Sequence, residues 1–131
     1  DEYKYIISGN KRDLNRYKWN QKRLDNLLKD KTSKQSVFYK QILNLISIKK
    51  QNKAFHPNAK RENLNMGKKI FCFKRTSLDK KNIIYNITNL SSKYQKFKFD
   101  YKFSKYKNLL DKTNISKKTE LKPFETLWLS N

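Results

Sequence analysis

The opening residues of the chain change from an aperiodic pattern to a helical spacing of leucines. Residues 1–18 show no clear period and are predicted to form a loop with a polar centre. A short helix is predicted over residues 21–29, with Asn20 in the position of an N-cap. Its apolar face consists of Leu24, Leu27 and Leu28.

A longer helix is predicted over residues 34–52, with Ser33 as its cap. Its apolar residues fall at i, i+4, i+7 and i+8, on one side of a helix: Phe38, Ile42, Leu45 and Ile46. Such a stripe must bury against another surface. Lys49 and Lys50 suit the negative end of the helix dipole. Pro57 ends any helical continuation.

After Pro57 the pattern changes from helical to alternating, which is typical of strands. Residues 69–75 form a nearly continuous apolar run suited to an inner strand, and the polar residues 76–82 predict a hairpin loop. Apolar and polar positions then alternate over residues 83–88 and 97–103, as in a sheet with one dry and one wet face. A last strand is predicted over residues 124–129. The carboxy-terminal part is therefore predicted to be an antiparallel β domain.

The 131 residues suffice for one ordinary domain or for the end of a larger one. Hydrophobic residues make up 36% and aromatic residues 14%, enough for a packed core, and two glycines and two prolines argue against a linker. No apolar run approaches the roughly 18–20 residues that span a bilayer, so no membrane partner is expected. Because the chain starts at Asp1 without a methionine, we expect it to be an internal or carboxy-terminal portion of a longer, cytoplasmic protein.

The formal net charge of +21 favours, at first sight, a basic nucleic-acid-binding or ribosome-associated protein. However, 27 of the 32 basic residues are lysine, whereas phosphate and base recognition favours arginine. The lysines are spread along the whole chain, and Lys, Asn, Ile, Tyr and Phe are together the residues of A/T-rich codons. Codon composition therefore explains the charge. We predict no nucleic-acid partner and keep that class of function as the alternative.

The single cysteine and the single histidine predict neither catalysis nor metal binding. Cys72 lies in the run Ile70–Phe73, where cysteine acts as a small buried hydrophobic residue, and one cysteine excludes an intrachain disulfide. His56 lacks the further Cys or His neighbours of a metal site, and we expect it to hold the turn from helix to sheet. We therefore predict no metal and no cofactor.

Several short motifs occur in the order and at the spacing of one enzyme family. Gly9–Arg16 (G-N-K-R-D-L-N-R) resembles the G-x-x-R-D-I-N-R segment of sucrose phosphorylases and related glucoside phosphorylases. Ala54–Ala59 (A-F-H-P-N-A) resembles the junction after the last barrel helix in one branch of that family. Ile70–Ser77, followed by Asn89–Ser91, resembles its first sheet strands, and Leu121–Leu129 resembles its closing L-x-P-Y-x-x-L-W-L strand.

Each of these motifs is weak alone, but their ordered combination covers almost the whole chain, with Leu14 in place of the usual Ile and Phe124 in place of the more usual Tyr. The resemblance implies an α+β fragment of an enzyme of the α-amylase superfamily. Residues 1–54 would be the last loop and two helices of a (β/α)8 barrel, and residues 55–131 a small antiparallel β domain. The barrel sheet would then bury the apolar stripe of the long helix.

The resemblance also implies a retaining double displacement that moves glucose from sucrose or a related α-glucoside to phosphate. An Asp would attack the anomeric carbon, a Glu would act as acid and then as base, and a second Asp would hold sugar hydroxyls. In the family these carboxylates lie on earlier barrel strands, so no catalytic residue maps to this chain, which is expected to be inactive alone. The donor stays open among sucrose, sucrose 6-phosphate, glucosylglycerol and glucosylglycerate, as does a hydrolytic or inactive paralogue.

The candidate substrate-binding residues are Arg12, Asp13 and Arg16. Arg12 matches the family arginine that helps to hold the glucosyl unit, where a fixed cation orders hydroxyls and a neighbouring carboxylate; an ion pair within the loop is the alternative. Asp13 and Arg16 are expected mainly to lock the loop. Trp128 and the aromatic stripe of residues 97–103 are expected to be core. If that stripe were exposed, it would favour a third class, a carbohydrate-binding β module.

Overall fold

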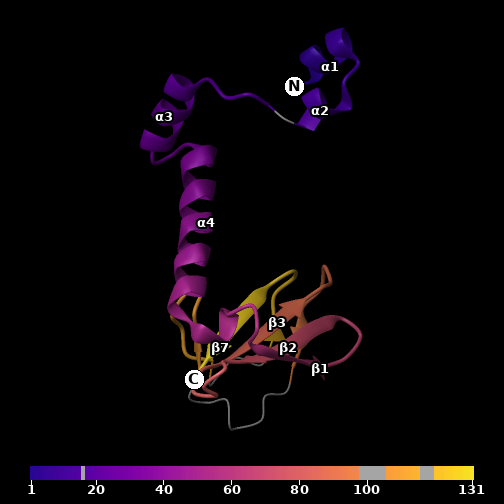
Figure 1. Ribbon diagram of the computed structural model, residues 1–131. Coiled ribbons are helices and arrows are strands. Elements are labelled where there is room, and N and C mark those ends of the chain that lie inside the picture. The colour runs from indigo at the N-terminus through magenta and orange to yellow at the C-terminus, as the bar shows by residue number, and fades with distance from the viewer. Residues whose placement is uncertain (16, 98–105, 116–119) are drawn as a thin grey trace. The chain divides into compact units, whose positions relative to one another are not determined.

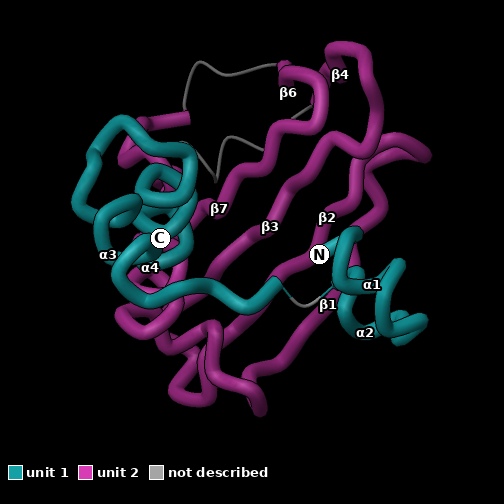
Figure 2. Tube along the Cα trace, turned by 90° about the horizontal axis from the view of Figure 1, so that it is seen from above, with its two compact units in different colours: residues 1–43 teal, residues 44–131 magenta. Residues whose placement is uncertain are grey.

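The computed structural model of the protein (Figure 1) describes four segments, residues 1–15, 17–97, 106–115 and 120–131. Their fold is α+β, with helices before residue 56 and antiparallel strands after it, which confirms the predicted order of elements. The chain forms two compact units, residues 1–43 and residues 44–131 (Figure 2). The change from helix to strand lies at the A-F-H-P-N-A motif, whereas the two units divide within the long helix.

The first unit begins with two short helices where the sequence pattern predicts a loop: α1 spans Glu2–Ser8 and α2 spans Lys11–Asn15. The Asp1 side chain caps α1 by accepting a hydrogen bond from the Lys4 backbone N–H. Gly9 ends α1 at a φ of 63°, a conformation that glycine adopts without steric cost. The prediction of a loop over residues 1–18 is therefore wrong. The sequence shows no helical period there because neither short helix buries an apolar face.

The two predicted helices and their caps are confirmed. α3 spans Gln21–Lys29 and α4 spans Lys34–Gln51. The Asn20 side-chain oxygen caps α3 by accepting a 3.0 Å hydrogen bond from the Arg23 backbone N–H. The Ser33 hydroxyl caps α4 by accepting a 3.0 Å hydrogen bond from the backbone N–H three residues further on. Local capping chemistry therefore sets both helix starts.

The apolar stripe of α4 is exposed along the helix. The exposed fractions of its side chains are 64% for Phe38, 39% for Ile42, 38% for Leu45 and 43% for Ile46. Neighbouring apolar side chains are exposed as well, namely Val37, Tyr39 and Leu43. This helix therefore carries a broad apolar surface of the kind that usually marks a contact with other protein. The burial of the stripe stays a prediction.

The second unit contains a five-stranded antiparallel sheet in the order β1-β2-β3-β7-β5, whose three inner strands run side by side in Figure 2. The strands are β1 (Lys60–Asn65), β2 (Ile70–Thr76), β3 (Ile83–Asn89), β5 (Lys107–Asn108) and β7 (Thr126–Ser130). A two-stranded sheet pairs β4 (Gln95–Lys96) with β6 (Glu120–Leu121). The predicted strands at residues 69–75 and 83–88, and the hairpin loop between them, are confirmed.

The sheet differs from the prediction at two strands. β1 was not predicted, because its sequence K-R-E-N-L-N holds one apolar residue; it forms an edge strand with mostly exposed side chains. β7 begins two residues later than predicted, because Pro123 and Phe124 form a turn in which Phe124 adopts a φ of 55°. Of the predicted strand over residues 97–103, Phe97 is buried and the remainder lies outside the described residues.

A hydrophobic core cluster of the second unit lies on one face of the sheet and consists of Ile70, Cys72, Ile87, Phe97, Ile115, Leu121, Leu127 and Leu129. Ala54, Ala59 and Ile84 are buried as well, outside this cluster. Cys72, Ile87 and Leu127 lie on one line across β2, β3 and β7. The predicted burial of Cys72 is confirmed, since its exposed fraction is 2%. Trp128 lies on the opposite face by strand alternation, half-buried against Phe55 with ring centroids 5.0 Å apart, so its expected place in this core is corrected.

Candidate functional site

Asp13 holds the turn between α1 and α2. Its carboxylate accepts a 2.7 Å hydrogen bond from the Ser8 hydroxyl and lies 4.0 Å from the Lys4 ammonium. The Asn10 side chain accepts a 3.0 Å hydrogen bond from the Arg12 backbone N–H, which fixes the start of α2. Two side chains of α1, Ser8 and Lys4, thus engage the Asp13 carboxylate, which leaves this carboxylate fewer oxygen lone pairs for a ligand.

The Arg12 side chain is exposed beside this turn. Within the described residues it forms neither an ion pair nor a side-chain hydrogen bond, so the ion pair considered as its alternative role is not formed there. A guanidinium presents five N–H donors in a planar fork that suits carboxylates, phosphates and paired hydroxyls. Arg16 lies outside the described residues. The structure therefore describes two of the three predicted residues, Asp13 engaged within the turn and Arg12 with an exposed side chain beside it.

Arg75 fastens the junction between helix and sheet. Its Nε donates a 2.7 Å hydrogen bond to the Ala54 carbonyl, and its Nη2 donates a 2.6 Å hydrogen bond to the His56 carbonyl. The Asn82 side-chain oxygen accepts a 3.0 Å hydrogen bond from the Ala54 N–H. Ala54 itself is fully buried in the short 3-10 helix η1, Lys53–Phe55. The A-F-H-P segment is thus held by Arg75, near the end of β2, and by Asn82, the residue that precedes β3.

A charged cluster on the 77–82 hairpin completes the junction. The Asp79 carboxylate accepts a 2.6 Å hydrogen bond from the Ser77 hydroxyl and forms a 2.9 Å ion pair with Lys53 Nζ. These two contacts, followed by a hydrogen bond from the Lys81 backbone N–H, hold the pKa of Asp79 well below its usual value. Asp79 is therefore ionised at neutral pH and ties the residue before Ala54 to the hairpin.

His56 and Cys72 take structural positions. The Nδ1 atom of His56 accepts a 3.2 Å hydrogen bond from the Asn58 backbone N–H, so the ring takes part in the turn after η1. Burial raises the pKa of the Cys72 thiol to about 11, which leaves it protonated and a poor nucleophile at neutral pH. In the segments that the structure describes, no three His, Cys, Asp or Glu side chains gather as metal ligands would.

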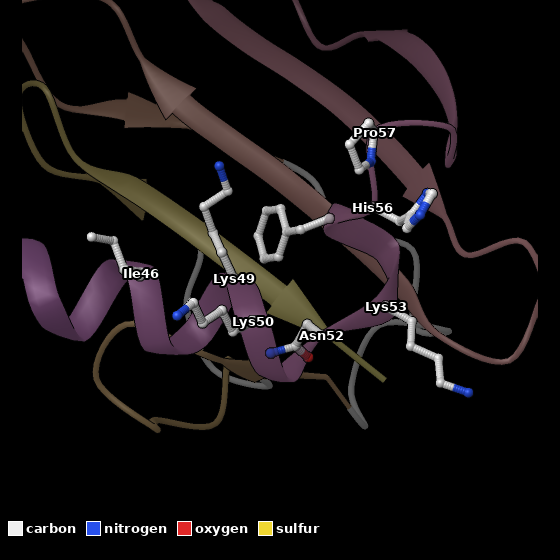
Figure 3. A pocket seen from close by; sticks show the side chains of 8 residues that line it. Ile46, Lys49, Lys50, Asn52, Lys53, His56 and Pro57 are labelled. Carbon is white, nitrogen blue, oxygen red and sulfur yellow. The ribbon is translucent and has the colours of Figure 1, made fainter.

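A hollow of about 470 Å³ lies beside the junction, entirely within the second unit (Figure 3). It is lined by the end of α4, by η1 and by the turn that follows: Ile46, Lys49, Lys50, Asn52, Lys53, Phe55, His56 and Pro57. The side chains of Lys49 and Lys50 point in different directions in Figure 3. Nothing in the sequence pattern marks this hollow, because Ile46 reads as part of a helical stripe and the two lysines as partners of the helix dipole.

No protein-family model and no curated protein matches this chain. None of the described helices combines the length and the apolar character that crossing a bilayer requires. Any assignment of function therefore rests on the residues and the geometry of the chain itself. The two candidate ligand sites are the exposed guanidinium of Arg12 and the hollow beside the junction.

Proposed function

We propose that this chain is the carboxy-terminal part of a cytoplasmic glucoside phosphorylase of the sucrose phosphorylase type. Residues 1–54 would close a (β/α)8 barrel, and residues 55–131 would be the β domain appended to it. The observation that carries the proposal is the ordered set of motifs, from Gly9–Arg16 to Leu121–Leu129. A set of this length and order is far more specific than any one of its members.

Contacts between distant motifs support the proposal for the β domain. Arg75, in the strand motif, donates to the carbonyls of Ala54 and His56 in the A-F-H-P-N-A motif. Asn89, in the N-L-S motif, is fully buried, and its amide donates a 2.8 Å hydrogen bond to the Lys122 carbonyl in the closing motif. The motif residues thus hold one another in place, as expected if they are retained together for one fold.

The exposed apolar side chains of the helices support the proposal for the barrel. Tyr3, Ile6 and Ile7 on α1 are 76%, 73% and 69% exposed, and the stripe of α4 is exposed as well. Apolar surface of this extent stabilises a protein only when it is removed from water. The outer helices of a (β/α)8 barrel bury such faces against the barrel sheet.

In the proposed enzyme, Arg12 would bind the glucosyl unit on the loop side of the barrel, and Asp13 would hold the turn that carries Arg12. The chemistry would be a retaining double displacement in which phosphate accepts the glucosyl group and glucose 1-phosphate is released. Its nucleophile, its acid/base and its second Asp would come from barrel strands that precede this segment. The 131 residues alone are therefore expected to release no glucose 1-phosphate.

The test uses the protein encoded by the complete reading frame. Release of glucose 1-phosphate is measured from sucrose, sucrose 6-phosphate, glucosylglycerol and glucosylglycerate, with and without inorganic phosphate. Phosphate-dependent release from one donor is the expected result. A reading frame without a barrel-sized region bearing three suitably placed carboxylates, or no release from any donor, would overturn the proposal. Salt-dependent retention on RNA would instead favour the nucleic-acid class.

Arg12→Ala in the same enzyme is expected to lower kcat/KM for the donor by about a hundredfold without unfolding the protein, because an oriented group near the substrate is lost. Arg23→Ala is the matched control, since it removes the same side chain from another position of the first unit. Turnover that is unchanged in Arg12→Ala would remove Arg12 from the site.

A further inference from the structure

The hollow beside the junction has an apolar floor that is held rigidly. The Phe55 ring packs against Trp128 with centroids 5.0 Å apart. Pro57 follows on the other side of η1. The backbone beneath them is pinned by Arg75, which donates hydrogen bonds of 2.7 and 2.6 Å to two carbonyls of this segment. A floor of this kind loses little conformational freedom when a ligand covers it.

The rim of the hollow carries positive charge that the described residues do not neutralise. Lys53 is paired with Asp79 at 2.9 Å, but Lys49 and Lys50 have no carboxylate within 4.0 Å in the described part of the chain. None of the eight lining residues is an Asp or a Glu. Interaction with the carbonyl end of α4 explains why lysines stand in the last turn, but it does not explain the apolar floor beside them.

The arrangement of these groups selects one kind of ligand. Lys49 and Lys50 are adjacent on α4, and their side chains point in different directions (Figure 3), so an extended acidic chain can meet both ammonium groups more readily than a single phosphate. The lining contains no arginine, which phosphate and base recognition favours. The apolar floor of Phe55 and Pro57 suits a large apolar side chain. Charge and shape together therefore favour an acidic polypeptide over a nucleic acid.

We propose that this hollow binds an acidic peptide segment, with one aromatic or aliphatic side chain on the floor and Asp or Glu residues beside Lys49 and Lys50. This interaction is separate from glucosyl transfer and does not depend on the proposed phosphorylase activity. It gives the junction between the end of α4 and the β domain a docking function for a partner protein whose binding segment is acidic.

Fluorescence anisotropy at physiological salt measures the binding of fluorescein-labelled peptides to the protein encoded by the complete reading frame. One peptide carries a central Phe flanked by Glu and Asp, and its twin carries Ala in place of Phe. The Phe peptide is expected to bind about tenfold more tightly than the Ala peptide, because a buried aromatic side chain adds apolar contact. The double variant Lys49→Glu/Lys50→Glu is expected to weaken binding of the Phe peptide about tenfold.

The matched control is Lys68→Glu/Lys69→Glu, an exposed adjacent pair in the β1–β2 turn that changes the net charge by the same amount. This control is expected to bind within about twofold of the unaltered chain. Equal losses of peptide affinity in both double variants would mean that the overall positive charge attracts the peptide and that the hollow is not a specific site. Equal affinity for the Phe and Ala peptides would mean that charge alone drives binding. Either result overturns the proposal. A single-stranded oligonucleotide that displaces the peptide from the unaltered chain but does not bind the Lys49→Glu/Lys50→Glu variant would also overturn the proposal. Because the two peptides are compared on the unaltered chain, the test stands even if a variant fails to fold, which circular dichroism would reveal.

Discussion

Arg75→Ala is expected to lower the free energy of unfolding of the second unit. The guanidinium donates two hydrogen bonds, to the Ala54 carbonyl at 2.7 Å and to the His56 carbonyl at 2.6 Å, and the first is partly buried. A hydrogen bond to a charged group contributes about 1.5–3 kcal/mol, less when water reaches it, so the loss should be about 2–4 kcal/mol. Arg75→Lys keeps the charge but cannot form the fork, and should lose about half as much.

Urea denaturation followed by tryptophan fluorescence measures this change. The chain has two tryptophans, so a Trp19→Phe background leaves Trp128, which packs against Phe55 at the junction, as the only reporter. Arg61→Ala is the control, because its guanidinium lies 4.5 Å from the Phe73 ring centroid, a cation–π contact that contributes about 0.5–1 kcal/mol. If Arg75→Ala costs no more than Arg61→Ala, the argument that Arg75 fastens the junction is refuted.

Three further predictions concern the same unit. Asn89→Ala should cost about 2–4 kcal/mol in urea denaturation, because the buried Asn89 amide donates hydrogen bonds of 2.7 Å to the Lys93 carbonyl and 2.8 Å to the Lys122 carbonyl, and its loss leaves these partly buried acceptors without their partner. Exposed Asn63→Ala should cost under about 0.5 kcal/mol. Cys72 should react with a thiol reagent at pH 8 far more slowly in the folded chain than in urea. Because folding raises the pKa of its thiol from 9.0 to about 11, the unfolded chain loses this proton first, and the free energy of unfolding should fall as pH rises from 9.0 to about 11. Asp79→Asn should lower the free energy of unfolding at pH 7. Because the pKa of Asp79 is lowered in the folded chain, the difference in free energy of unfolding between variant and unaltered chain should shrink as pH falls below the unfolded pKa of 3.8. A difference that stays constant with pH would contradict the ion pair and hydrogen bonds described for Asp79.

The sequence predicted those elements whose signal is local. Asn20 and Ser33 each cap a helix by accepting a hydrogen bond from a backbone N–H three residues further along the chain. Such a cap can be predicted because both partners lie within one short stretch of sequence. The β2–β3 hairpin followed in the same way from an apolar run, a polar loop and a second apolar segment. The order of helices first and strands afterwards was accordingly predicted.

The remaining features depend on contacts between distant residues. β1 is a strand because it pairs with the edge of β2, and the polar sequence of β1 does not by itself indicate this pairing. The role of Arg75 is set by two carbonyls about twenty positions earlier, and the hollow by the way η1 turns at the end of α4. For the candidate sugar site, the pattern singled out Arg12 and Asp13, but the tie between Asp13 and Ser8 required the fold of α1, which has no buried face.

The place of β7 inside the sheet sets the timing of folding during synthesis. Residues 126–130 are inserted between β3 and β5, although they follow both in the chain, and they bring Leu127 and Leu129 into the interior. Until these residues have left the ribosome, β3 presents an open edge with unpaired backbone groups. The sheet can therefore form completely only after β7 has been synthesised. Variants truncated before residue 126 should aggregate rather than fold into a slightly smaller version of the same structure.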